Sequence, residues 1–152
     1  MDSKIIKKEL EEIGKKYNLP VRELDRELEL TDYFVEKNEM SKFPARVIRR
    51  RLLDIFYSWS NYLHSFLFPN PQSIIATRDS EAFDEKEKDE IYKIIARLAK
   101  MTRGAVELEL RKEESGDAEF VRNNFEEFKK IKKQIEPFTK KNKEFWEKES
   151  GK

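Results

Sequence analysis

The longest apolar stretch of the chain, from Val47 to Phe68, constrains the fold more than any other feature. Its large apolar residues recur with the period of an α-helix, and neither Gly nor Pro interrupts them. The main stripe comprises Ile48, Leu52, Ile55, Phe56, Trp59, Leu63 and Phe66. Further apolar residues lie on the other sides of this helix, which is typical of a helix in the middle of a bundle. The segment also carries Asp54, Asn61 and His64, and it is too short and too polar to span a bilayer.

The N-terminal segment, residues 1–37, predicts an αα-hairpin. Ser3 can cap a first helix that ends near Tyr17. A short turn that ends in Pro then starts a second helix, because Pro is favourable in the first turn of a helix. We expect this second helix to extend towards Val35.

Within this segment, residues 13–28 (IGKKYNLPVRELDREL) are similar to the helix-turn-helix pattern of DNA-binding proteins. Gly14 stands at the usual small position, Asn18 at the turn and Leu24 at the apolar position of the second helix. The resemblance implies a second helix that reads a DNA groove. From Val21 to Asp32, however, two Arg stand against five acidic residues, which is a poor surface to offer a phosphate backbone. We therefore interpret the segment as a plain αα-hairpin.

Two long amphipathic helices are predicted in the second half of the chain, over residues 84–111 and 117–146. Asp84 and Glu87 have the spacing of a capping box at the start of the first. Asp117 can cap the second. In both segments, apolar residues recur at intervals of three and four, as expected for helices that each bury one face.

Three further details complete the predicted fold. Residues 73–77 (SIIAT) form a short apolar piece that we expect to pack against the bundle. Apolar residues alternate with acidic ones from 106 to 110, so a short strand is an alternative to helix there. Pro137 is expected to kink the last helix without ending it. The sequence thus predicts an all-α bundle of about five helices, a single domain over 1–152 with the helix at 44–68 in its centre.

The composition excludes several classes of protein. Charged residues make up 41% of the chain, yet the net charge is +1, so there is no global attraction to nucleic acid or membrane. The chain has no Cys, which excludes disulfides and cysteine metal sites. The N-terminus carries no apolar signal core, from which we expect a cytoplasmic protein. The abundance of Lys and Glu, with only two Gln, resembles the composition of thermophile proteins.

The strongest charge cluster lies at the start of the central helix. It comprises five basic residues without an acid, Lys42, Arg46, Arg49, Arg50 and Arg51. A helix N-terminus favours negative charge, so the helix dipole does not explain such a cluster. The helical wheel places Arg46 and Arg50 opposite the main apolar stripe, and Arg49 and Arg51 beside it. Three interpretations remain open: ion pairing with the acidic run 81–90, contact with phosphate or nucleic acid, and contact with a protein partner.

A second basic segment, residues 129–143, contains seven Lys and one Glu. A solvated helix face is the usual meaning of such a run, and an electrostatic footprint for an acidic partner is the alternative. The candidate residues for nucleic acid or an acidic partner are Arg46, Arg49, Arg50, Lys129, Lys132 and Lys133. The candidate protein-interaction residues are the aromatics Tyr57, Phe145 and Trp146.

No catalytic, metal or cofactor pattern stands out. His64 is the only histidine, which leaves no histidine pair for a metal site, and we interpret it as a structural or surface residue. There is no Gly-rich phosphate loop. The leading hypothesis is a non-enzymatic interaction or scaffold protein that docks a protein partner through helix faces, without contact to a membrane. The alternative is weak, non-specific nucleic-acid binding through the local basic patches.

Overall fold

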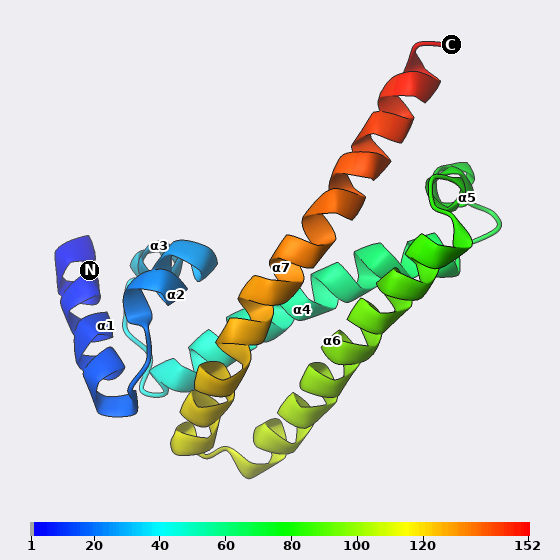
Figure 1. The fold of residues 1–152 in the computed structure, drawn as a ribbon. Helices are drawn as coiled ribbons and strands as arrows, with labels where there is room; N and C mark the ends of the chain where they lie inside the picture. Colours follow the sequence, from blue (N-terminus) through cyan, green and yellow to red (C-terminus); the bar gives the residue numbers. More distant parts are fainter. Residues whose placement is uncertain (1) are drawn as a thin grey trace. The chain divides into compact units, whose positions relative to one another are not determined.

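The structure, a computed structural model, describes residues 2–152 and is all-α (Figure 1). Helices make up 84% of it, and no strand occurs among the described residues. This part of the chain forms seven helices: α1 (Ser3–Tyr17), α2 (Val21–Leu28), α3 (Leu30–Lys37), α4 (Pro44–Leu67), α5 (Ile74–Glu81), α6 (Glu85–Arg111) and α7 (Glu114–Ser150). The predicted all-α class is confirmed. The predicted count of about five helices is too low, because α3 and α5 are separate helices.

The described residues divide into two compact units. Unit 1 consists of Met1–Ile55 and Gly104–Glu126, and unit 2 consists of Phe56–Arg103 and Glu127–Lys152. The helices α4, α6 and α7 each contribute one part to each unit. The single domain over 1–152 stays a prediction. None of the seven helices in the described part is long and apolar enough to cross a membrane.

The first two helices of unit 1 meet at a close contact. Asp2, and not Ser3 as predicted, is the N-cap of α1, and its carboxylate accepts from the Lys4 backbone N–H at 3.0 Å. A β-carbon on Gly14 would lie 2.9 Å from both γ-carbons of Val21 at the start of α2. Only glycine fits there without a shift, so the small residue of the turn pattern has a steric cause.

The second predicted helix is wrong in one respect, because it breaks at Glu29 before it reaches Val35. Glu29 adopts a left-handed conformation with φ 52°, which separates α2 from α3. The Asp25 carboxylate closes this break by accepting from the backbone N–H and the hydroxyl of Thr31, at 2.7 and 2.6 Å. The N-terminal αα-hairpin over 1–37 is therefore a three-helix arrangement.

The central helix α4 begins at Pro44 and ends at Leu67, close to the predicted bounds. Five residues of its main apolar stripe are fully buried: Ile48, Leu52, Phe56, Leu63 and Phe66. Ile55 and Trp59 are half-buried. The helical period therefore identifies the buried side of α4 correctly in each unit.

The short helix α5 of unit 2 corrects the prediction for residues 73–77. Ser73 caps it by accepting from the Ala76 backbone N–H at 3.1 Å. Ile74 and Ile75 are 81% and 65% exposed and do not pack against the bundle. The later turn of α5 makes the contact instead, where the buried Ser80 hydroxyl donates to the Phe66 carbonyl at 2.7 Å.

The helix α6 begins with the predicted capping box. The Asp84 backbone N–H donates to the Glu87 carboxylate at 3.1 Å, and the Glu87 backbone N–H donates to the Asp84 carboxylate at 2.8 Å. The alternative of a strand over 106–110 is wrong, because the helix continues to Arg111.

The last helix differs from its predicted start. It runs from Glu114 to Ser150 instead of from 117 to 146, so Asp117 lies inside the first turns and is not the cap. Pro137 lies within the helix and does not end it, as predicted. Its apolar stripe is buried as expected: Val121, Phe125, Phe128, Ile131, Ile135 and Phe138.

Candidate interaction surfaces

The arginines of the basic cluster lie largely inside unit 1. Arg49 is fully buried and Arg46 is 9% exposed, whereas Arg50 is about half exposed. The prediction that these side chains lie off the buried surface is wrong for the first two. A buried guanidinium requires acidic partners, since an isolated buried charge is very unfavourable.

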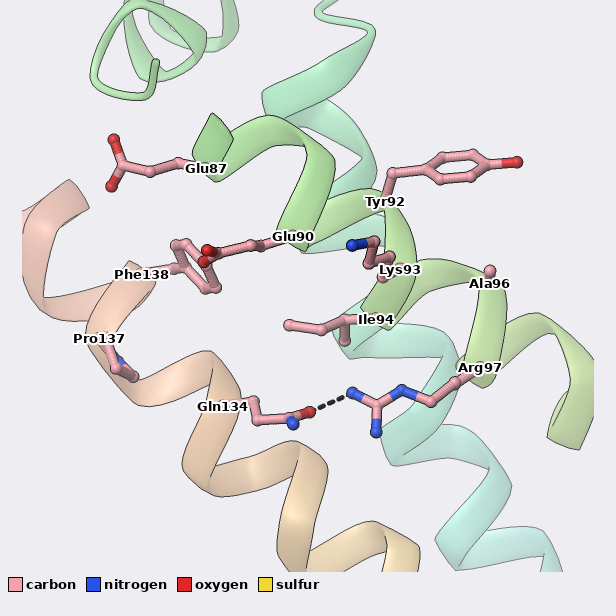
Figure 2. A pocket seen from close by; sticks show the side chains of 10 residues that line it. All are labelled: Glu87, Glu90, Tyr92, Lys93, Ile94, Ala96, Arg97, Gln134, Pro137 and Phe138. Atoms are coloured by element: carbon pink, nitrogen blue, oxygen red, sulfur yellow. Dashed lines mark hydrogen bonds between the residues drawn. The ribbon is translucent and has the colours of Figure 1, made fainter. Parts of the chain in front are cut away.

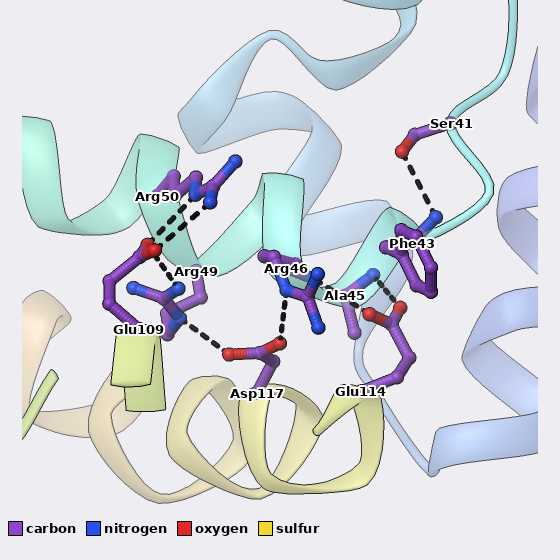
Figure 3. Close-up of polar contacts among 9 residues, drawn as sticks. All are labelled: Ser41, Phe43, Ala45, Arg46, Arg49, Arg50, Glu109, Glu114 and Asp117. Carbon is purple, nitrogen blue, oxygen red and sulfur yellow. Dashed lines mark hydrogen bonds and ion pairs between the residues drawn. The ribbon is translucent and has the colours of Figure 1, made fainter. Parts of the chain in front are cut away.

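The central partner is Asp117, which is itself fully buried (Figure 3). One carboxylate oxygen accepts from Arg49 Nε at 2.6 Å, and the other accepts from Arg46 Nε at 3.1 Å. Asp117, in the first turn of α7 where we expected a cap, therefore neutralises two buried cations.

The second partner is Glu109 near the end of α6. Its carboxylate accepts from Arg49 Nη2 at 2.5 Å and from Arg50 through Nε and Nη2 at 2.8 and 3.0 Å. These bonds from Arg50 and Arg49 lower the pKa of Glu109 from its ordinary value of 4.5 to about 2. The ion pairing predicted for the cluster thus exists, but with Glu109 and Asp117 and not with the run 81–90.

The first turn of α4 has an acidic cap supplied by another helix. The Glu114 carboxylate accepts from the backbone N–H groups of Ala45 and Arg46, at 2.5 and 3.3 Å (Figure 3). A carboxylate is the group that a helix N-terminus favours. Burial nevertheless raises the pKa of Glu114.

Arg51 also acts within the fold. Its Nε and Nη2 donate to the Leu28 carbonyl at 3.0 and 2.7 Å, where the end of α2 leaves that oxygen without a helical partner. Its guanidinium lies 4.6 Å from the centre of the Tyr33 ring. All four arginines from 46 to 51 therefore hold helices of unit 1 together.

The candidate lysines lie on the part of α7 that belongs to unit 2, whereas the arginines belong to unit 1. Lys132 and Lys133 are exposed and Lys129 is partly exposed. Other lysines of the segment form ion pairs, as between Lys141 and Glu87 at 2.5 Å. This face of α7 is a charged, solvated surface with both signs present.

The aromatic candidates differ in their surroundings. Trp146 is half-buried and donates through Nε1 to the Asp79 carboxylate at 2.6 Å. The ring of Phe145 lies 5.5 Å from the Arg78 guanidinium. Both therefore join α7 to α5 within unit 2, whereas Tyr57 is 41% exposed on α4.

A polar node around Asp79 was missed by the sequence reasoning. The same carboxylate oxygen that accepts from Trp146 also accepts from the Asn142 amide at 2.7 Å, and the Asn142 oxygen accepts from the Tyr62 hydroxyl at 3.1 Å. Burial and then Asp79 raise the pKa of Tyr62. The four residues come from three helices, so no local spacing could reveal them.

A groove of about 750 Å³ lies between α6 and α7 in unit 2 (Figure 2). Its lining includes Ile94 and Phe138, which are 4% and 7% exposed, together with Ala96 and Pro137. The remaining lining residues are Glu87, Glu90, Tyr92, Lys93, Arg97 and Gln134. Arg97 reaches across and donates to the Gln134 side chain. This volume lies in the range of ligand-binding clefts, and apolar residues with a few charged ones are typical of such clefts.

The remaining candidates carry little chemistry. His64 is exposed, and its ring lies 5.3 Å from that of Phe68. Among the described residues, no group of three or more His, Cys, Asp or Glu side chains could hold a metal ion.

Comparison with protein-family models, with curated proteins and with solved structures finds no match to this chain. Its function is therefore inferred from its own surfaces.

Proposed function

We propose that this chain is a non-enzymatic interaction protein that binds another protein through the groove between α6 and α7. The observation that supports this proposal is the groove itself, with Ile94 and Phe138 in its lining and charged residues beside them. A groove between two helices can receive the apolar side of a third helix, which is a common mode of peptide recognition. Glu90, Lys93 and Arg97, which all line the groove from α6, would select a segment that carries both signs of charge.

The test is co-purification of the tagged full chain from its native cell, with and without nuclease. In the variant Ala96→Glu, a charge enters the groove at an exposed helix position. We expect the protein partner to be lost. The matched control, Asn123→Glu, adds the same charge at an exposed position of α7 that does not line the groove, and should retain the partner. Retention by both variants would contradict the proposal.

Nucleic-acid binding is the second candidate, and the exposed lysines of α7 favour it. Lys132, Lys133 and Lys140 are exposed in a segment with a single Glu. Arg46 and Arg49 are engaged with Asp117, so this candidate depends on lysines, which attract phosphate without the fork geometry of arginine. Binding would be weak and indifferent to sequence.

A fluorescence-anisotropy titration of short DNA and RNA tests this candidate. The log–log slope of affinity against salt should be roughly −0.9 per neutralised phosphate on duplex, or −0.7 on a single strand. Replacement of Lys132, Lys133 and Lys140 by Ala should flatten that slope. In the co-purification, loss of the bound material after nuclease treatment would favour this candidate over the protein partner.

A further inference from the structure

The part of α4 that lies in unit 2 carries an unusual surface. Charged residues make up 41% of the chain, yet residues 55–77 contain no Asp, Glu, Lys or Arg. At the average of the chain, a stretch of this length would contain about nine. Burial does not account for this absence, because several of these residues are exposed on α4.

Besides Ser58, four exposed residues form one stripe along the helix. They are Tyr57, Asn61, His64 and Phe68, which we call the α4 face. Their spacing of four, three and four places them on one side of an α-helix. The helical geometry extends through Phe68, because its backbone N–H donates to the His64 carbonyl at 2.9 Å. Tyr57 is 41% exposed and Phe68 is 66% exposed.

From residue 55 on, the residues that flank this stripe are also uncharged, and the nearest charge on α4 is the exposed Asp54, three positions before Tyr57. Ser58, Ser60 and Ser65 stand beside it, and their small side chains allow another helix to approach closely. A solvated helix of this chain looks different: the exposed face of α7 carries Lys133, Glu136 and Lys140. Interface centres are depleted of charge and enriched in aromatic residues, so the α4 face has the composition of an interface.

We propose that the α4 face binds a second copy of this chain, with the two copies of α4 antiparallel. The stripe has an internal symmetry, since Tyr57 and Asn61 are four positions apart, and so are His64 and Phe68. With a two-fold axis midway between Asn61 and His64, the Tyr57 ring of each copy meets the Phe68 ring of the other. The Asn61 amide of each copy meets the His64 imidazole of the other, and the two can form a hydrogen bond.

Charge is the argument for a second copy over other occupants. Two identical surfaces repel each other when they carry net charge, and this one carries none. An anionic bilayer would require flanking lysines or arginines, whereas the charged residues on either side of the stretch are Asp54 and then Arg78 with Asp79. The surface shares no residue with the lining of the groove between α6 and α7, so the inference is independent of the proposed function.

The dimer is expected to be weak. The stripe spans twelve residues, or about 18 Å of helix, which is less than a standard interface. Association is therefore concentration-dependent.

Sedimentation velocity of the full chain, from about 1 µM to about 1 mM, tests the inference. We expect a shift from monomer to dimer over this range. The variant Asn61→Lys/His64→Lys places like charges opposite each other and should weaken association at least tenfold. The control Asn123→Lys/Thr139→Lys adds the same charge at exposed positions of α7 and should dimerise like the unmodified chain. Circular dichroism verifies that each variant keeps its helix content.

The arrangement is tested by a charge swap. In Asn61→Lys/His64→Asp, opposite charges face each other in the antiparallel pair, so dimerisation should be retained. In a parallel pair, like charges would meet, and a monomeric swap variant would overturn the antiparallel pairing. An unmodified chain that stays monomeric up to about 1 mM would overturn the whole inference. Binding of that monomer to phosphatidylcholine vesicles, lost in Asn61→Lys/His64→Lys, would instead assign the surface to lipid and also overturn it.

Discussion

The two parts of α4 place charged and apolar residues in opposite ways. In unit 1 the helix buries Arg46 and Arg49 against Asp117. In unit 2 the same helix exposes Tyr57 and Phe68 within a stretch, residues 55–77, that contains no charged residue. Arg46 and Arg49 of the basic cluster, which in the sequence indicates a surface for a partner, are therefore interior, whereas Arg50 is about half exposed. The uncharged stretch from 55 to 77, whose composition is typical of a core, lies partly at the surface.

This contrast shows that the type of charge matters more than its amount. An arginine offers five donors in a planar fork, so one buried guanidinium can bind two carboxylates at once, as Arg49 binds Asp117 and Glu109. The lysines of α7 remain at the surface, where their compact, strongly hydrated charge is favourable. In the sequence, the arginines of α4 and the lysines of α7 both form basic runs. Only the acidic partners that each run meets in the structure distinguish them.

The strongest way to break unit 1 is to remove the buried acid. Asp117→Asn keeps the shape of the side chain but leaves Arg46 and Arg49 buried with less compensation. We expect a loss of about 3–5 kcal/mol in the free energy of unfolding, measured by urea denaturation. The control Asp54→Asn removes an exposed charge from α4 and should change stability by less than about 0.5 kcal/mol. Equal effects of the two variants would contradict the buried network.

A smaller loss is expected from the polar node of unit 2. Asp79→Ala removes the acceptor shared by Asn142 and Trp146. Because Asp79 is only half-buried, we expect a loss of about 1–3 kcal/mol, together with a shift in Trp fluorescence. Asp89→Ala, at an exposed position of α6, serves as the control. If Asp79→Ala lowered the free energy of unfolding as much as Asp117→Asn does, the two units would not differ in how strongly they depend on a buried acid.

The smallest effect concerns pH. The pKa of Glu109 is lowered to about 2 in the folded chain, so its contribution to stability is complete above about pH 5 and is lost as the pH falls towards 2. Glu109→Gln should cost about 1 kcal/mol at pH 7, since the side chain is 38% exposed and solvent screens it. The difference from the unmodified chain should shrink below about pH 5 in urea titrations. A constant difference down to about pH 2 would contradict the lowered pKa.

Glu114 responds to pH with the opposite sign. Burial raises its pKa in the folded state, so this group favours folding more as the pH falls through its titration. The change in stability of unit 1 at low pH therefore combines a loss from Glu109 and a gain from Glu114. The variant Glu109→Gln removes the first contribution and leaves the second.

Periodicity was sufficient to predict the regular part of this fold. The core stripes of α4 and α7 and the capping box of α6 follow from residue spacing within one helix. The break at Glu29 could not be predicted, because Glu has no intrinsic preference for positive φ. That break depends on Asp25 with Thr31, and on Arg51, which binds the Leu28 carbonyl from another helix.

The candidate surfaces were predicted less completely, because burial of a charge depends on which acids arrive from distant helices. Arg49 and Asp117 are 68 positions apart, and no local pattern connects them. The groove between α6 and α7 likewise depends on how two helices pack. The absence of charged residues from 55 to 77 can be read from the sequence. The helical period does not reveal it, because the period identifies only which side of α4 is buried.

The central claim is that the arginines of α4 act inside the fold and are not offered to a partner. Hydrogen exchange of the arginine Nε–H groups, followed by ¹H–¹⁵N NMR, tests this most directly. We predict that the Nε–H signals of Arg46 and Arg49 exchange slowly, because both donate to the buried Asp117. They should also stay unshifted when a short oligonucleotide or polyphosphate is added. Fast exchange of both signals, or a shift on addition of either anion, would contradict the account.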